Sequence, residues 1–144
     1  MSNTIVVGYD GSDSSLRALN FAVDRAKAEK AELIVAHVLE WSPYAFLTPT
    51  ELEERHKRRG EELDRANKHV LEPLTKRLSD TGVKVTTELR YGRTADTLCS
   101  IAAEKSASQI IIGRTGGSGI AARLFGAVAG SVAQVATVPV TIVP

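Results

Sequence analysis

Short runs of β-branched residues alternate along the chain with longer segments in which apolar residues recur at every third or fourth position. The short runs are typical of buried strands, and the longer segments have the period of helices that bury one side. Since parallel strands are joined through helical crossovers, this alternation predicts an α/β fold with a parallel sheet. We expect five strands, at residues 4–9, 32–39, 83–89, 109–112 and 138–143.

Helical segments connect these strands. The serine cluster at 12–15 is typical of a helix N-cap, so the first helix should begin there. In the long charged region between the second and third strands, Gly60 and Pro73 predict a kink or two separate helices. The remaining helical regions are expected over residues 51–80, from about Thr94, and over about 120–136.

An open sheet of five strands with right-handed crossovers has few strand orders, of which 3-2-1-4-5 is the commonest doubly wound arrangement. We therefore predict one Rossmann-like or flavodoxin-like domain over residues 1–144, with helices on both faces of the sheet. In this order the first and fourth strands are neighbours, and the helices that follow them leave to opposite faces. A ligand crevice is expected at the carboxyl ends of these two strands.

Both strands at this crevice end in glycine-containing turns, GYDGS at residues 8–12 and GRTGGSG at residues 113–119. Glycine lets backbone amides approach an anion closely, and a helix N-terminus adds unpaired donors. This position favours phosphate binding over a merely flexible loop. The spacing is neither the Walker pattern nor Gly-x-Gly-x-x-Gly.

Composition narrows the choice of partners and location. A net charge of +1 provides no field that would attract nucleic acid or an anionic membrane. The single cysteine, Cys99, cannot form an internal disulfide, which favours a reducing, cytoplasmic setting, and no signal peptide is indicated. Residues 124–144 are uncharged and long enough to cross a bilayer, but their glycines, polar residues and Pro139 argue against a membrane span.

Over essentially its whole length the chain resembles the universal stress protein family, and in particular its ATP-binding branch. The resemblance is carried by the first strand and turn at 5–12, the second strand at 33–38 and residues 92–113. It implies a homodimer through the last strand, Val138 to Val143. Such an edge strand carries unpaired backbone groups that can pair with a second copy.

The ATP-binding signature of that family is Gly-x-x-Gly, nine residues, then Gly-Ser or Gly-Thr. Gly113, Gly116 and Gly126 match it, whereas Ala127 stands where the family has a hydroxyl residue. One lost neutral hydrogen bond costs about 0.5–1.5 kcal/mol, or roughly threefold to tenfold in affinity. The departure is therefore expected to weaken ATP binding without abolishing it.

The resemblance also implies roles for residues at the strand ends. Asp10 corresponds to the acidic residue near adenine and ribose, and Val38 and Ile112 correspond to apolar positions that line the adenine. Arg114, beside the glycines, has the charge to pair with phosphate. The candidate ligand-binding residues are Gly8, Tyr9, Asp10, Val38, Ile112, Gly113, Arg114, Gly116, Gly126 and Ala127. The implied ligand is ATP, with or without Mg²⁺.

No catalytic constellation or metal-ligand spacing stands out in the sequence, since only Asp10 is an obvious acid near the crevice. The leading hypothesis is an ATP-binding switch or sensor in stress responses, with slow or no hydrolysis. The alternatives are a dimeric interaction protein whose crevice binds no nucleotide, and a weak ATP hydrolase or phosphoacceptor domain. A phosphoacceptor aspartate would follow the third strand, where the chain has Glu88-Leu89-Arg90. We expect His37 to be an interior or rim histidine and Cys99 a core residue.

Overall fold

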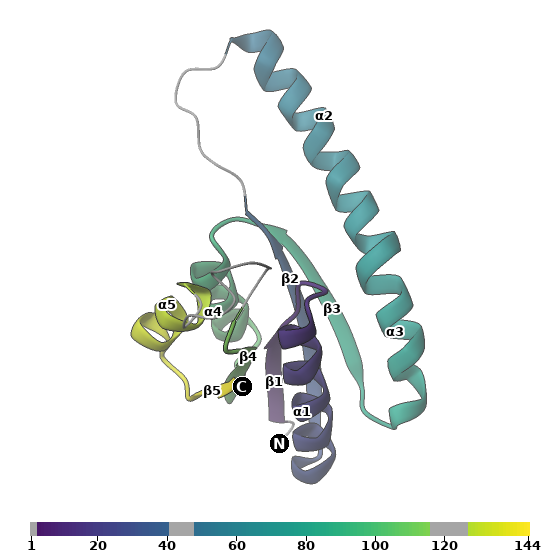
Figure 1. The fold of residues 1–144 in the computed structure, drawn as a ribbon, viewed down its shortest axis with the longest axis vertical. Coiled ribbons are helices and arrows are strands. Elements are labelled where there is room, and N and C mark those ends of the chain that lie inside the picture. Colours follow the sequence, from purple (N-terminus) through teal and green to yellow (C-terminus); the bar gives the residue numbers. More distant parts are fainter. Residues whose placement is uncertain (1–2, 41–47, 116–126) are drawn as a thin grey trace.

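The computed structural model describes residues 3–40, 48–115 and 127–144. Within these ranges, five parallel strands form one sheet in the order β3-β2-β1-β4-β5, which confirms the predicted doubly wound α/β topology (Figure 1). The strands are β1 Asn3–Gly8, β2 Ala31–Leu39, β3 Val85–Tyr91, β4 Gln109–Gly113 and β5 Val140–Val143.

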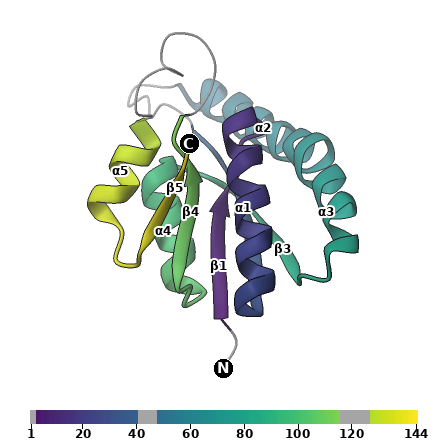
Figure 2. The same ribbon diagram turned by 60° about the horizontal axis from the view of Figure 1, so that its bottom comes forward.

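Helices cover both faces of this sheet (Figure 2). Their bounds are α1 Asp13–Glu29, α2 Pro49–Ala66, α3 Glu72–Leu78, α4 Thr94–Glu104 and α5 Ala127–Val135. The helices α1 and α3 pack on one face, and α4 and α5 pack on the other. Because α1 follows β1 and α5 follows β4, the connections after these neighbouring strands reach opposite faces. The point where the strand order reverses therefore lies between β1 and β4, as predicted.

The central strand β1 is buried on both sides. Ile5, Val6 and Val7 are fully buried. Alternation along the strand sends Ile5 and Val7 to the α1 and α3 face and Val6 to the α4 and α5 face. A one-residue slip would exchange these side chains between two filled cores, so the packing fixes the height at which β1 reaches the carboxyl edge of the sheet.

The strand β3 lies two residues further along the chain than the sequence predicted, at Val85–Tyr91 and not at 83–89. The chain first passes through a left-handed turn at Gly82, where φ is 79°. The strand then continues for as long as β2 offers partners, up to the pair Leu39 and Tyr91. A local run of β-branched residues contains no information about where the partner strand ends.

The last strand is also shorter than predicted, because β5 begins at Val140 and not at Val138. Proline has no N–H to donate, and Pro139 contributes only its carbonyl, which accepts a hydrogen bond from the Ile110 N–H at 3.0 Å. The preceding helix α5 ends at Val135, one residue from the predicted end, while its predicted start at residue 120 lies outside the described residues.

The long charged helical region accommodates Gly60 and Pro73 differently from the prediction. Gly60 lies within α2 without breaking it, and Figure 1 shows α2 and α3 as one continuous rod. The turn Asn67–Leu71 is π-helical, with the Glu72 N–H bonded to the Asn67 carbonyl, and it comes just before Pro73. One widened turn thus accommodates the missing proline donor, where we had expected a kink or two helices.

The apolar C-terminal segment is built into the sheet. Its described part forms the nine-residue helix α5 and the strand β5, which pairs with β4. Across the described ranges, no helix combines the length and the apolar character that a membrane span requires.

Candidate functional site

The candidate residues lie at the carboxyl edge of the sheet, where β1, β2 and β4 end (Figure 2). Gly8 ends β1, and Tyr9 and Asp10 follow it in the turn to α1. The other described candidates are Val38 near the end of β2, Ile112 and Gly113 at the end of β4, Arg114 directly after it, and Ala127, the first residue of α5. Gly116 and Gly126 lie outside the described residues.

Asp10 and Arg114 occupy matching places on the two central strands. The register between β1 and β4 pairs Val7 with Ile111. Asp10 lies three residues beyond Val7, and Arg114 lies three residues beyond Ile111. Both are exposed, so a carboxylate and a guanidinium follow the ends of neighbouring strands at equal separations from a paired residue.

The turn after β1 is held by its own polar groups. Ser12 caps α1, because its hydroxyl accepts a hydrogen bond from the Ser15 N–H at 3.2 Å. The Asp10 N–H in turn donates to the Ser15 hydroxyl at 3.3 Å. Gly11 has a φ of 85°, a left-handed conformation that favours glycine, and it lets the chain turn into the helix.

The same turn keeps the Asp10 carboxylate ionised. Partial burial opposes ionisation, but the hydrogen bonds from Ser12, whose N–H donates to the carboxylate at 2.9 Å, and from Ser15 outweigh it. With a smaller contribution from nearby His37, they lower the pKa of Asp10 below its usual value. At neutral pH this carboxylate is an acceptor, suited to hydroxyl or amino groups of a ligand.

Gly113 is required by close packing. A Cβ atom at this position would lie 2.3 Å from the Ser14 Oγ and 2.8 Å from the Ser14 carbonyl oxygen. The end of β4 is therefore pressed against the first turn of α1, and only glycine fits between them. Sequence reasoning named Gly113 as a phosphate-binding glycine but missed Ser14, which is 5% exposed.

The two backbone amides after Gly113 are both used within the protein. The Arg114 N–H donates to the Val143 carbonyl of β5 at 2.8 Å, and the Thr115 N–H donates to the Ser14 Oγ at 3.3 Å. Neither amide is available to a phosphate in this arrangement. In the described part of this turn, the Arg114 side chain is the cationic group that remains exposed to an anion.

Gly8 also serves packing. A Cβ atom there would lie 3.2 Å from the Leu98 Cδ1 and 3.3 Å from the Ile112 Cγ2, which is tighter than ordinary contact. Glycine at this position thus lets β4 and α4 approach the end of β1 closely.

His37 and Cys99, the two side chains of reactive type that the sequence analysis considered, pack within the protein. His37 is buried, and its Nδ1 lies 2.7 Å from the Tyr9 carbonyl, to which it donates a hydrogen bond. This contact supports the turn that carries Asp10 and confirms the expected interior position. Cys99 is half-buried, and burial, with a smaller contribution from Asp96, raises the pKa of its thiol. The neutral thiol is favoured, so Cys99 is not an activated nucleophile.

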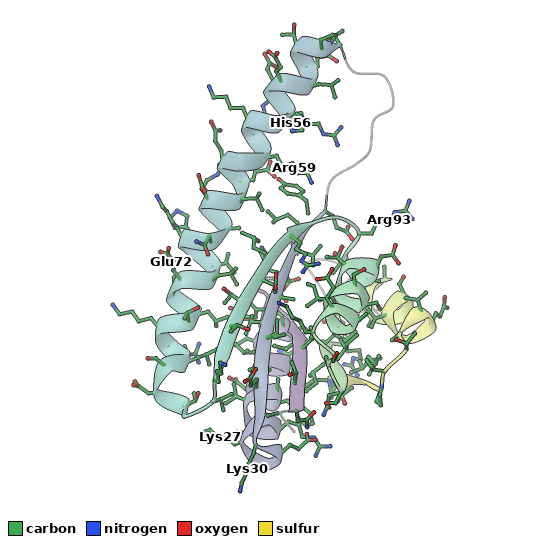
Figure 3. All side chains as sticks on the ribbon, turned by 180° about the vertical axis from the view of Figure 1, so that it is seen from behind. Lys27, Lys30, His56, Arg59, Glu72 and Arg93 are labelled. Carbon is green, nitrogen blue, oxygen red and sulfur yellow. The ribbon has the colours of Figure 1, made fainter. Side chains whose placement is uncertain are left out.

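The other end of the same sheet edge, where β2 and β3 finish, is held by charged side chains. Glu40 accepts hydrogen bonds from the Thr94 N–H at 3.0 Å and the Thr94 Oγ1 at 2.8 Å, which fixes the start of α4. The Tyr91 hydroxyl donates to Glu62 of α2. The guanidinium of Arg59, which is labelled on α2 in Figure 3, lies 4.6 Å from the centre of the Tyr91 ring.

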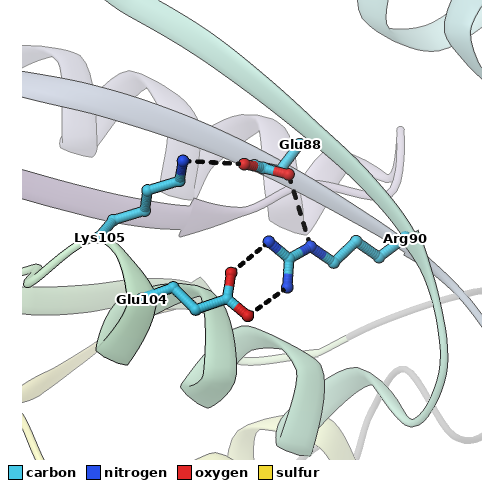
Figure 4. Close-up of polar contacts among 4 residues, drawn as sticks. All are labelled: Glu88, Arg90, Glu104 and Lys105. Carbon is cyan, nitrogen blue, oxygen red and sulfur yellow. Dashed lines mark hydrogen bonds and ion pairs between the residues drawn. The ribbon is translucent and has the colours of Figure 1, made fainter.

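A network of ion pairs joins β3 to the end of α4 (Figure 4). Arg90 donates two hydrogen bonds to Glu104, at 3.1 and 2.5 Å, and its Nε lies 3.5 Å from Glu88. Lys105 lies 3.5 Å from the other Glu88 oxygen. Glu88, which stands close to where a phosphoacceptor would be expected, is thus engaged in structural ion pairs. In the described ranges, no three His, Cys, Asp or Glu residues gather to form a metal site.

The fold defines a doubly wound α/β protein, and its candidate site for anions and hydroxyl groups lies at the sheet edge where β1 and β4 end. The sequence model of the universal stress protein family matches residues 1–144. Universal stress protein MJ0531 of Methanocaldococcus jannaschii is 35% identical in an alignment of 144 positions that spans 96% of this chain and 80% of the relative. The chain belongs to the universal stress protein family.

Solved structures agree with this assignment. Universal stress protein UspA from Lactobacillus plantarum superposes with a TM-score of 0.81 at 25% identity, over 99% of this chain and 97% of that one. A universal stress protein solved in complex with cAMP superposes with a TM-score of 0.65 at 31% identity, again over 99% and 97% of the two chains.

Proposed function

We propose that this universal stress protein binds ATP in the crevice between β1 and β4 and acts as a nucleotide-dependent switch or sensor. The observation that carries the proposal is the placement of Asp10 and Arg114 at matching positions beyond paired strands. An ionised carboxylate can accept hydrogen bonds from ribose hydroxyls, and a guanidinium can pair with phosphate oxygens. The relative of 31% identity solved with cAMP supports an adenine nucleotide as the ligand class.

In this proposal the adenine lies against Val38 and Ile112, near the ends of β2 and β4. Hydrolysis is slow or absent, because Asp10 is an ionised acceptor already engaged by Ser12 and is not a base poised beside a γ-phosphate. Mg²⁺, if it accompanies ATP, would be bound largely through the phosphates.

Two measurements test ATP binding. The purified protein is denatured and the supernatant is assayed for released adenine nucleotide, and the emptied, refolded protein is titrated by calorimetry with ATP, ADP, AMP and cAMP. We expect ATP to bind more tightly than AMP, because Arg114 is exposed to the phosphates. A blank in both measurements would refute the proposal, and a clear preference for cAMP over ATP would refute the choice of ligand.

A matched pair of variants locates the site. Asp10→Asn removes the carboxylate at the crevice and should weaken ATP binding roughly tenfold to a hundredfold, the value of a hydrogen bond to a charged group. Asp13→Asn removes an exposed carboxylate from the first turn of α1 and should leave affinity unchanged. Equal affinities for the two variants would place the nucleotide elsewhere.

The second candidate function is a dimeric interaction protein without nucleotide, and Ala127 favours it. Ala127 begins α5 and has no hydroxyl to offer a ligand. Ala127→Ser should raise ATP affinity threefold to tenfold if the crevice binds ATP. No detectable binding by either form would favour the interaction protein.

We further propose a homodimer through the edge strand β5, within the segment Val138 to Val143, and a cytoplasmic location. β5 is paired on one side only, with β4, and its residues are half-buried. A monomeric mass by light scattering at micromolar concentration would argue against the dimer. The single cysteine, Cys99, supports a reducing compartment.

A further inference from the structure

The first turn of α1 carries two buried hydroxyls that hold the two sides of the crevice. Ser14 and Ser15 are 5% and 6% exposed. Ser15 accepts a hydrogen bond from the Asp10 N–H, on the β1 side. Ser14 accepts a hydrogen bond from the Thr115 N–H, on the β4 side, over a sequence separation of 101 residues.

Ser14 fixes the backbone on one side of Arg114, and β5 fixes it on the other. The Arg114 N–H donates to the Val143 carbonyl at 2.8 Å, and the next N–H, that of Thr115, donates to the Ser14 Oγ at 3.3 Å. The residue before Arg114 is Gly113, whose Cα is pressed against Ser14. Arg114 is exposed, whereas Gly113 and Thr115 on either side of it are half-buried, so the two hydrogen bonds fix the backbone from which the guanidinium extends.

We propose that Ser14 is a positioning residue that acts through Arg114. By holding the Thr115 amide, the Ser14 hydroxyl orients the backbone that carries the guanidinium toward the phosphates of the bound nucleotide. The inference rests on the proposed ATP binding. Ser14 itself contacts no ligand, since it is buried between α1 and β4.

The physical basis is a preorganisation effect. Thr115 is a half-exposed residue, so in the absence of the hydroxyl we expect its N–H to bond to water and the protein still to fold. The stretch after β4 then populates several orientations, and only a fraction of molecules present Arg114 correctly. Apparent affinity falls in proportion to that fraction. Adenosine, which lacks phosphate, does not use Arg114 and should bind equally well in either case.

The test is a double-mutant cycle on ATP affinity, with adenosine as the second ligand. Calorimetry is performed on the full-length protein and on Ser14→Ala, Arg114→Gln and the double variant. Ser100→Ala, which removes an exposed hydroxyl from α4, is the matched control. We expect Ser14→Ala to weaken ATP binding about threefold to tenfold, the value of one neutral hydrogen bond, with adenosine affinity unchanged. In the Arg114→Gln background the same substitution should have no further effect on ATP.

Each other outcome counts against the inference in a distinct way. If the wild-type protein binds no ATP, the proposed function fails and the role of Ser14 fails with it. If the wild type binds but Ser14→Ala binds ATP equally well, only the positioning role is refuted. Equal losses for ATP and adenosine would show a general structural role, and additive losses in the cycle would show that Ser14 does not act through Arg114.

Discussion

The carboxyl edge of the sheet is built in two different ways. Where β1 and β4 end, the close contacts are between backbones and small side chains, with Gly113 against Ser14 and amides bonded to a serine hydroxyl and a carbonyl. Where β2 and β3 end, the contacts are charged and exposed, between Glu40 and Thr94 and between Tyr91 and Glu62. The second half also carries the ion pairs around Arg90.

The difference follows from what each half must do. Contacts between close-packed backbones leave no room for adjustment, so they fix positions to fractions of an ångström, as a ligand site needs. Exposed charge pairs are individually worth little and tolerate movement. Exposed contacts such as those of Tyr91 with Glu62 and Arg59 join α2 to β3, and α2 extends beyond the edge of the sheet with one buried residue, Ala66 (Figure 1). We therefore expect substitutions in the β1–β4 half to change both stability and ligand binding, and substitutions in the β2–β3 half to change stability alone.

Gly113→Ala should have the largest effect. The new Cβ would overlap both the hydroxyl and the backbone carbonyl of Ser14, and shortening the Ser14 side chain would relieve only the first. The substitution should lower the free energy of unfolding by about 1–3 kcal/mol, as overpacking does, and reduce ATP binding below detection. Chemical denaturation and calorimetry measure the two effects.

Gly60→Ala is the matched control for that substitution. Gly60 lies inside α2, and a Cβ there would meet no atom within 4 Å. Alanine should raise the free energy of unfolding by about 0.5–1 kcal/mol, because it restricts the unfolded chain and favours the helix. A destabilised Gly60→Ala, or a Gly113→Ala of normal stability, would contradict the packing described for these two glycines.

Glu40→Ala should have an intermediate effect confined to stability. Removing the carboxylate leaves the Thr94 N–H at the start of α4 without its acceptor, and loss of such a cap costs about 1 kcal/mol. Glu53→Ala, at an exposed position of α2, should cost little. ATP affinity should stay within about twofold of wild type in both variants. A loss of affinity as large as that of Gly113→Ala would show that the two halves are not independent.

The same division explains how far the sequence could predict the structure. The five strands, their order and the inner faces of the helices follow from periodicity and short-range connection rules, which are local information. The bounds of β3 depended on the length of β2, a long-range pairing, and were wrong by two residues. The π-helical turn before Pro73 depended on how a helix absorbs a missing donor, which has several solutions.

In the candidate site, the sequence could identify Gly113 as a candidate residue but not the physical reason why glycine is needed there. The glycine was assigned to phosphate approach, whereas the structure gives it a packing partner 99 residues away, in Ser14. No local pattern marks Ser14, because serines near a helix start are expected as caps. The sequence signal is a glycine at the end of a buried strand; because Gly113 has no positive φ in the structure, packing and not backbone conformation requires it. The matching places of Asp10 and Arg114 could be read from the predicted strand order once the register was known.

Tyr91 should give the smallest effect on stability, one that is present at neutral pH and is lost at high pH. Burial, together with the hydrogen bond to Glu62, raises the pKa of Tyr91 from 10.0 to about 12. Because the folded state favours the neutral phenol, the contact stabilises the protein fully below pH 10 and loses this contribution as the pH rises from 10 through 12.

Tyr91→Phe removes this titration. Below pH 10 the variant should be less stable than wild type by less than about 1 kcal/mol, since the contact is largely exposed. The difference should vanish above pH 12, where the ionised wild-type phenol faces Glu62. Tyrosinate absorbance, followed in both proteins while circular dichroism reports an intact fold, identifies the late-titrating tyrosine among the three in the chain. If all three wild-type tyrosines ionise over the same pH range as the two that remain in the variant, Tyr91 is not bonded to Glu62. The attachment of α2 to β3 would then be weaker than the structure indicates.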